Sequence, residues 1–383
     1  MTDNTGIDFP GLTDIHVHPA MNAFFWDRDL RRHYFTYKKF CPLASLSDFQ
    51  MLEEGNVKVI WSVLHVPEED YFRNPAIRLL GHVTKGGRTM LKLNAWDAML
   101  RMMSEMEWQV ARTGGKFTVA RTYAELEEAI AAEKRAVIHT VEGGHMLSAG
   151  LADGDVASRL TRLETLARRG VASLTIAHLF RNDLAGHSEC IPPEQHKILF
   201  WRLDTGVDDS LGLTKTGKEV VKAMAAPEIR IIPDVTHCSP VSRQEIYDLV
   251  GDEIPIVATH TGVQTLNSAP VNLSERDVKA IAASGGVVGV IFMPFWLKEE
   301  DPGPGLEAIW ETMKQINDWS GGKWEHVAIG TDFDGFTDPP DDCTSAKELP
   351  SVEAMLKTKG LAQAEVDAVL GTNARRVLRD GWR

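Results

Sequence analysis

The chain has 383 residues, of which 43% are hydrophobic and 25% charged, a composition typical of a globular protein and not of a disordered one. Its net charge of −13 argues against nucleic acid or an anionic membrane as the main partner. The opening residues MTDNTGIDFP lack the basic and apolar regions of a secretion signal, and no apolar run is long enough to span a bilayer. We therefore expect a soluble, cytoplasmic protein.

The four cysteines (Cys41, Cys190, Cys238 and Cys343) are scattered along the chain without a Cys-x-x-Cys spacing. The sequence therefore predicts neither a disulfide framework nor a thiolate zinc site. It contains no internal repeat, low-complexity tract or Pro/Ser linker, so residues 1–383 are expected to form a single domain.

Eight short β-rich runs recur along the chain, most of them separated by segments with helical spacing. Their Val and Ile content is typical of parallel strands that are buried on both faces. The runs cover residues 11–18, 58–65, 136–144, 171–178, 229–237, 254–260, 285–293 and 326–335. Intervening segments such as 155–170, 242–251 and 274–286 have apolar residues three to four apart and end at glycine, as helices do.

Eight alternating strand and helix units predict an α/β fold of the (β/α)₈ TIM-barrel class. A doubly wound sheet is the alternative, but it more often has a glycine-rich phosphate loop after its first strand, and none is present here. Long connections of residues 19–57 and 66–134 follow the first and second strands. Because both leave the carboxyl end of a strand, we expect these insertions to lie over the barrel mouth, where barrel enzymes carry their chemistry.

Residues that can bind metal or transfer protons close six of the eight predicted strands. His16 and His18 end the first strand, so their side chains point the same way, about 6–7 Å apart along the backbone. The later strand ends carry Glu142, His178, His237, His260 and Asp332. Imidazole and carboxylate are the ligands expected for zinc or a similar divalent ion. These groups are too many for one tetrahedral ion, and they suffice for two ions bridged by a carboxylate and a hydroxide.

Strand parity and position sort the remaining histidines. His139 lies an odd number of residues before Glu142 and should therefore face the outer helices. His326 begins the eighth strand and belongs to the barrel floor, whereas His65 and His145 follow strand ends and can reach the mouth. We expect loop positions for the other four, which are His33, His82, His187 and His196.

Five motifs in chain order, VEGGH, LTIAH, DVTHCS, VATHTG and IGTDFDG, resemble those of the membrane (renal) dipeptidases, peptidase family M19 of the amidohydrolase superfamily. The similarity runs from residue 11 to the C-terminus, where GTNARRVL resembles the family's closing segment. The resemblance implies a (β/α)₈ barrel that holds two zinc ions and hydrolyses dipeptides, with a small molecule as its binding partner. It also allows a homodimer.

Carried over to this chain, the resemblance implies metal ligands at six strand-end positions: His16, His18, Glu142, His237, His260 and Asp332. The first two positions would hold one ion and the two later histidines the other, with the glutamate bridging them. Asp332 would contact the bridging water as general base and then protonate the leaving nitrogen. His178 matches the family histidine that stabilises the tetrahedral oxyanion and touches the substrate.

Two positions depart from the family pattern. The family usually has His-x-Asp on the first strand, whereas this chain has His16-Val17-His18, which makes the site one unit more positive. A water on that ion should lose its proton more readily, and the ion should be held less tightly. The family commonly has Arg-Asn after the VATHTG motif, where the arginine grips the substrate's terminal carboxylate, and the matching pair here is Val271-Asn272. Valine cannot make that contact, which weakens the prediction of an ordinary dipeptide substrate.

The connection after the first strand offers five cations among aromatic residues: Arg28, Arg31, Arg32, Lys38 and Lys39. We hypothesise that part of this loop covers the pocket and contacts the substrate.

Two alternatives to a dipeptidase stay open. One is a superfamily enzyme that acts on a lactone, an N-acyl amino acid or a deaminase-type substrate, and the other is a barrel that binds a ligand without turnover. Glu142 on the third predicted strand favours the dipeptidase arrangement over relatives that bridge their metals with a carboxylated lysine on the fourth.

Overall fold

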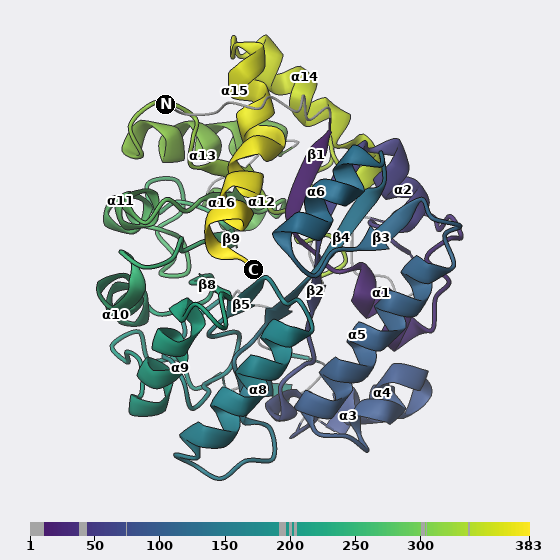
Figure 1. The fold of residues 1–383 in the computed structure, drawn as a ribbon, viewed down its shortest axis with the longest axis vertical. Coiled ribbons are helices and arrows are strands. Elements are labelled where there is room, and N and C mark those ends of the chain that lie inside the picture. The colour runs from purple at the N-terminus through teal and green to yellow at the C-terminus, as the bar shows by residue number, and fades with distance from the viewer. Residues whose placement is uncertain are drawn as a thin grey trace.

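The barrel is seen in a computed structural model that describes residues 11–37, 44–73, 75–190, 197–198, 201–202, 205–299, 303, 305–335 and 338–383. Eight parallel strands lie side by side in chain order, which confirms the predicted (β/α)₈ class (Figure 1). They are β1 (Leu12–Val17), β2 (Val57–Leu64), β4 (Arg135–Glu142), β5 (Ser173–Thr175), β8 (Ile232–Asp234), β9 (Ala258–Thr261), β10 (Val288–Val290) and β11 (Val327–Ile329). A parallel bridge between Asp234 and Val257 joins β8 to the residues before β9 and nearly closes the ring.

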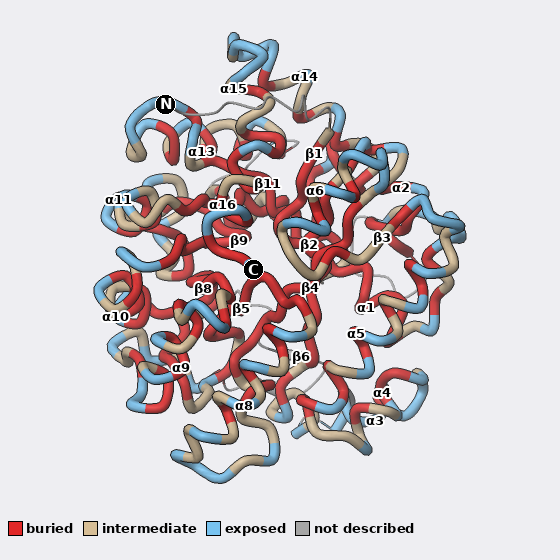
Figure 2. Tube along the Cα trace, in the orientation of Figure 1, coloured by how far each residue is buried: buried red, intermediate tan, exposed pale blue. Residues whose placement is uncertain are grey.

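Helices surround the strands and turn their exposed residues outward, while the buried residues follow the central ring (Figure 2). The larger helices are α1 (Pro19–Trp26), α3 (Pro75–Val83), α5 (Ala95–Ala111), α6 (Tyr123–Ala131), α8 (Val156–Arg168), α9 (Lys215–Ala225), α10 (Pro240–Val250), α11 (Glu275–Ala283), α13 (Leu306–Trp319), α14 (Pro350–Thr358) and α16 (Asn373–Gly381). Shorter ones are α2 (Phe49–Glu54), η1 (Glu69–Arg73), α4 (Lys85–Met90), α7 (His145–Ser148), α12 (Pro294–Leu297), η3 (Ala346–Glu348), α15 (Gln363–Asp367) and the π-helical turn η4 (Ala368–Thr372).

The three helices predicted from the sequence are confirmed as α8, α10 and α11, and their ends show why they form there. The side chain of Asp155 accepts a hydrogen bond from the backbone N–H of Ser158, which satisfies one of the free donors at the start of α8. Gly170 follows the end of α8 with a φ of 81°, a left-handed conformation that glycine adopts without strain. At α11, Ser274 and Asp277 form a reciprocal capping box.

A buried apolar cluster closes one end of the ring. It joins Ile15, Trp61 and Ile138 of the strands to Leu378 and Trp382 at the C-terminal helix. Figure 1 shows α16 and the C-terminus over the centre of the strands in this view. Since one end is closed by the packed C-terminal helix, chemistry in this barrel is left to the end where the strands finish.

The connection of residues 66–134 differs in part from its prediction. Its first residues do lie at the mouth, where Glu68 contacts His178. Its last part does not, because the short strand β3 (Phe117–Val119) pairs with the opening residues of β4, at the opposite end of that strand from Glu142. The expectation that the whole insertion covers the mouth was therefore wrong. A further antiparallel pair, β6 (Lys197–Ile198) and β7 (Trp201–Arg202), belongs to the connection after β5.

His139 faces outward from β4, as parity predicts, and is completely buried against α5, with its Nε2 atom 3.8 Å from a carboxylate oxygen of Glu107. Neither ring nitrogen has a hydrogen-bond partner among the described residues. Burial lowers the pKa of His139 from 6.5 to about 4. Because the folded state then binds fewer protons than the unfolded state between these pH values, His139 lowers stability as the pH falls from 6.5 toward 4 and has no such effect at neutral pH.

The free energy of unfolding of His139→Gln is therefore expected to depend less on pH, between pH 6.5 and 4, than that of the wild type. The wild-type free energy of unfolding should lose about 3 kcal/mol more than the variant's between neutral pH and pH 4, as 1.36 kcal/mol per pKa unit requires. Urea unfolding at several pH values measures the two slopes. His82→Gln, on the exposed face of α3, is the matched control and should follow the wild-type slope. Parallel slopes for His139→Gln and wild type would contradict the prediction.

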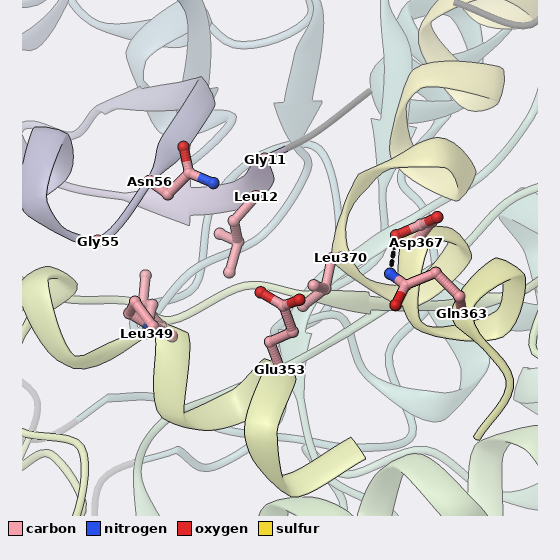
Figure 3. Close-up of a pocket in the computed structure, with 10 residues that line it drawn as sticks. Gly11, Leu12, Gly55, Asn56, Leu349, Glu353, Gln363, Asp367 and Leu370 are labelled. Atoms are coloured by element: carbon pink, nitrogen blue, oxygen red, sulfur yellow. Dashed lines mark hydrogen bonds between the residues drawn. The ribbon is translucent and has the colours of Figure 1, made fainter. Parts of the chain in front are cut away.

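A pocket of about 320 Å³ opens at the amino end of β1 (Figure 3). Its lining includes Gly11, Leu12, Asn56 and Leu349, together with the carboxylate of Glu353. None of the predicted site residues lines it, and it lies at the opposite end of β1 from His16 and His18. This pocket is therefore separate from the candidate site.

Candidate metal centre

The carboxylate of Glu142, the last residue of β4, lies at the centre of a group of imidazoles. Its Oε1 atom is 3.3 Å from Nε2 of His16, 3.4 Å from Nε2 of His237 and 3.4 Å from Nε2 of His260. Its Oε2 atom is 3.6 Å from Nε2 of His18. All five side chains are buried. These side chains come from the ends of β1, β4 and β9 and from the residues just after β1 and β8, and they meet at one point, as the rim of a parallel barrel allows.

The histidines form two pairs on either side of this carboxylate. His16 and His18 have their Nε2 atoms 3.1 Å apart, and His237 and His260 have theirs 3.0 Å apart. Asp332 joins the first pair, with Oδ1 at 2.9 Å from Nε2 of His18 and 3.7 Å from Nε2 of His16. The arrangement is therefore two histidine pairs with a shared glutamate.

A single hydroxyl orients one histidine from each pair. Oγ1 of Thr259 lies 2.9 Å from Nδ1 of His16 and 3.0 Å from Nδ1 of His260. The same hydroxyl donates to the buried carboxylate of Asp234 at 2.6 Å. Because its proton goes to Asp234, its lone pairs accept the Nδ1–H groups of both rings. In the neutral form of each ring, Nε2 is then the nitrogen without a proton, and it faces the cluster.

His237 is held in the same way by a different partner. Its Nδ1 atom lies 3.1 Å from Sγ of Cys190, and this thiol itself donates to the carbonyl of Ser188. Groups of this kind behind the ligands fix ring tautomers in metal sites and raise the basicity of the inward nitrogen.

Inward-facing imidazole nitrogens and carboxylates form a donor set that fits divalent cations. Three combinations in the described chain place their ligand atoms within 4.8 Å of one another. They are His16–Glu142–His260, His16–His18–Asp332 and His65–Glu142–His178. So many buried lone pairs without protons between them are unfavourable unless a cation lies among them. The residues present therefore fit a divalent metal.

The pKa values of the side chains in the cluster depend on one another. Burial alone would raise the pKa of Glu142, but the surrounding imidazoles, His16 foremost, hold it well below its ordinary value. Burial and the neighbouring His16 lower the pKa of His260 well below 6.5. Burial opposes protonation of His18, yet the adjacent Asp332 carboxylate raises its pKa. Since protons compete with cations for the same nitrogens, metal affinity at this site should weaken in acid.

Two of these side chains reach the cluster from strained backbone. His237 has a φ of 66° and Asp332 a φ of 59°, both in the left-handed region that non-glycine residues seldom adopt. Gly335 leaves room beside Asp332, because a Cβ atom there would lie 2.0 Å from Oδ1 of Asp332 and 2.8 Å from the ring of His18. The DFDG turn therefore has to end in glycine for these side chains to fit.

His178 lies beside the cluster, with Nε2 at 3.8 Å from Oε1 of Glu142. Its other ring nitrogen contacts Glu68, which the sequence did not indicate. His65 lies against His178 with ring centroids 4.2 Å apart and the rings tilted by 51°, and its Nδ1 lies 3.0 Å from the backbone oxygen of Glu142. His145 lies next to His65, on the side away from the cluster, and contacts the carbonyl of Val66. Both histidines after strand ends thus reach the mouth, as predicted.

The other predicted histidines are not part of the cluster. His326 contacts the carbonyl of Gly286 at the start of β11, on the barrel floor as expected. His33 is exposed and His187 is a buried loop residue. His82 is also exposed, but it lies in α3, so the expectation of a loop position there was wrong. His196, Lys38, Lys39 and Cys41 lie outside the described residues, while Cys190, Cys238 and Cys343 are free thiols.

At the position where the family commonly has a carboxylate-binding arginine, this chain has an apolar side chain that packs in the core. Val271 is buried in the main core, and the side chain of Asn272 binds the N–H of Gly262 and the carbonyl of Trp296. In the loop after β1, Arg31 pairs with Asp29. Arg28 is buried and donates to the carbonyl of Ala44, while Arg32 is exposed. Burial raises the pKa of Asp334 in the DFDG turn, and the nearby Arg28 opposes that rise, so this arginine acts beyond its own loop. The role of the loop as a cover stays a prediction.

The fold and the donor set define a barrel metallohydrolase. A family profile described as membrane dipeptidase (peptidase family M19) matches residues 14–381. The chain therefore belongs to the M19 family of metallopeptidases, as the motifs predicted. Among the described residues, no helix is long and apolar enough to cross a membrane.

Individual relatives agree with this membership. A protein of the pqqA 5′ region of Klebsiella pneumoniae is 28% identical over 295 residues, which cover 75% of this chain and 97% of that protein. The dipeptidase verJ of Clonostachys rogersoniana is 23% identical over 333 residues, covering 87% of this chain and 75% of verJ. A crystal structure of a metallo peptidase from Rhodobacter sphaeroides, liganded with a phosphinate mimic of the dipeptide L-Ala-D-Ala, has a TM-score of 0.75 at 19% identity. The match covers 98% of this chain and 100% of that one, which shows the shared fold.

Proposed function

We propose that this chain is a binuclear zinc hydrolase that cleaves a dipeptide or a similar small amide. One observation supports the proposal above all others. The carboxylate of Glu142 lies between two histidine pairs, with four Nε2 atoms between 3.3 and 3.6 Å from its oxygens. A shared carboxylate between two sets of imidazoles is what a two-ion site requires.

This geometry supports an assignment of the residues that would hold the ions. His16 and His18 would hold the first ion, His237 and His260 the second, and Glu142 both. When bound, divalent ions supply Lewis-acid chemistry, because they polarise the substrate carbonyl and lower the pKa of an attacking water. The histidines contribute by keeping their Nε2 lone pairs directed inward through the partners behind them.

Asp332 is the proposed proton carrier. Its carboxylate joins the first histidine pair, and its side chain is only 11% exposed, so bulk water competes little for it. In the proposed reaction it accepts the proton that the attacking water loses and delivers it to the leaving nitrogen. Asp332 would also complete the ligand set of the first pair.

His178 is the proposed stabiliser of the oxyanion. It lies next to the cluster without belonging to either histidine pair. A donor held at this edge of the site can direct Nε2–H toward the oxygen that becomes negative during attack on the carbonyl.

The substrate is the least constrained part of the proposal. The Rhodobacter sphaeroides relative with a phosphinate dipeptide mimic supports a dipeptide-like ligand. The buried Val271, in the place where the family commonly has arginine, favours a second candidate whose substrate lacks a free terminal carboxylate. An N-acyl amide or a lactone would fit that requirement.

A metal titration combined with a substrate panel tests both candidates. Apoprotein is reconstituted with zinc and assayed against L-Ala-D-Ala, an N-acetyl amino acid amide and a homoserine lactone, with zinc content measured in parallel. Dipeptide hydrolysis that reaches its maximum at two zinc ions per chain supports the main proposal. Turnover of the lactone or the blocked amide alone supports the second candidate, and a fully folded protein that binds no zinc contradicts both.

Thr259→Val is expected to weaken zinc binding at both positions. Valine keeps the shape of threonine but removes the hydroxyl that accepts from His16 and His260. Loss of such a partner costs about 10- to 100-fold in metal affinity, and competition with a chelator measures it. Thr259→Ser should retain most of the affinity. The control is Thr312→Val, which removes a buried hydroxyl that bonds to the carbonyl of Ala308 within α13. Equal affinities for Thr259→Val and Thr312→Val would contradict the assigned role.

A further inference from the structure

Glu68 contacts His178 from outside the set of strand-end residues. It lies in the connection after β2, immediately before η1, and is buried. Its Oε1 atom lies 2.8 Å from Nδ1 of His178 and accepts a second hydrogen bond, at 3.2 Å, from the backbone N–H of Leu179. The carboxylate therefore binds both the side chain of His178 and the backbone that follows it.

This contact determines which end of the imidazole faces the cluster. An ionised carboxylate can only accept hydrogen bonds, so Nδ1 of His178 donates to Glu68 and carries a proton. Burial opposes ionisation of Glu68, but the nearby His178 and His145 lower the pKa of this carboxyl below its ordinary value. The opposite nitrogen, Nε2, is left facing Glu142 at 3.8 Å.

Neighbouring rings restrict the remaining freedom of His178. His65 lies against it with ring centroids 4.2 Å apart, and His237 meets it edge to face at 4.6 Å. The hydrogen bond from Nδ1 to Glu68 and the contacts with these two rings restrict the orientation of the imidazole. Orientation of this kind is what a histidine needs to act at a defined atom.

The second oxygen of Glu68 separates this carboxylate from an ordinary structural one. Oε2 is buried and has no hydrogen-bond partner among the residues that the structure describes. Buried carboxylates that only support a fold generally have both oxygens bonded. Burying an oxygen without a hydrogen bond costs free energy of folding. This cost supports a role for Glu68 in the reaction and not only in the fold.

We propose that Glu68 is a positioning residue for His178, and that it holds the imidazole with Nε2 directed at the carbonyl oxygen of the substrate. This inference rests on the proposed function, because it needs His178 to act on the substrate. It also assigns a role to the insertion after β2, which brings Glu68 to the mouth. Donation from Nε2 to that oxygen requires the form of the ring that carries protons on both nitrogens.

The test is a kinetic cycle on the zinc-loaded full chain. Glu68→Gln keeps the size of the side chain and removes its charge, and we expect kcat to fall about 10- to 100-fold with KM changed less than about twofold. Zinc content should equal that of wild type. Glu69→Gln, the same change at the next and exposed residue, is the matched control and should leave kcat unchanged.

The double variant makes the test specific to His178. In a His178→Asn background, Glu68→Gln should cause no further loss of kcat, because the group through which Glu68 acts is gone. The inference is overturned by an equal loss in both backgrounds, by loss of zinc in Glu68→Gln, or by a kcat like that of Glu69→Gln. If Glu68→Gln does not fold, Glu68→Asp is measured in the same cycle by the same criteria. A wild-type protein that binds zinc but hydrolyses nothing in the panel contradicts the proposed function itself, and so differs from these outcomes.

Discussion

Glu142→Gln removes zinc from both positions and lowers turnover by at least about 100-fold; this is the largest effect that we expect from a single substitution. Changes to groups behind metal ligands already cost 10- to 100-fold, and Glu142 touches four of the proposed ligands directly. An amide cannot balance the charge of two cations or bridge them as a carboxylate does. Elemental analysis after dialysis and steady-state kinetics measure the two effects.

The control for this substitution is Glu128→Gln on the exposed face of α6, which should retain full zinc and activity. His18→Ala provides a graded comparison, because it removes one ligand of the first pair and leaves the second intact. We expect partial zinc loss there. Two zinc ions retained in Glu142→Gln would show that this residue does not bridge them.

Asp332→Asn abolishes most turnover while zinc remains bound. The amide keeps the shape of the side chain and an oxygen that can still contact a metal, but it cannot accept a proton. Loss of a general acid–base group costs about 10²- to 10⁴-fold in rate. The loss should appear in kcat, with KM and zinc content close to wild type, because the substrate contacts and histidine pairs are unchanged.

A parallel Asp252→Asn variant, at an exposed loop position after α10, controls for the removal of one negative charge. Retained turnover in Asp332→Asn would show that another group carries the proton. Joint loss of zinc and turnover would instead make Asp332 chiefly a ligand.

The sequence alone predicted that the residues at the strand ends share one site, because the carboxyl ends of parallel strands meet at one rim of the barrel. Glu142 and the histidines around it could therefore be grouped before any coordinates, and the structure places them within hydrogen-bonding or near-contact distances. Parity also placed His139 correctly on the outside. The grouping depends on the shared rim of parallel strands, and the placement of His139 depends on the two-residue repeat of a strand.

Partners from outside the strand ends could not be predicted in this way. Glu68 lies in an irregular connection, where no periodicity indicates the direction of a side chain. Thr259 precedes His260, so alternation alone would turn it away from the cluster, yet its hydroxyl reaches two of the rings. A repeated Thr before His, in DVTH and VATH, was the available signal. The left-handed backbone at His237 and Asp332 has no sequence signature comparable to glycine.

The hydroxyl of Thr259 links the two halves of the centre. Because it accepts from one ring of each pair, an ion that orders His16 also fixes the hydroxyl for His260, and the reverse holds equally. Occupancy of the two positions should consequently be cooperative, with a sigmoidal zinc isotherm that becomes hyperbolic, or splits into independent phases, once the shared oxygen is absent.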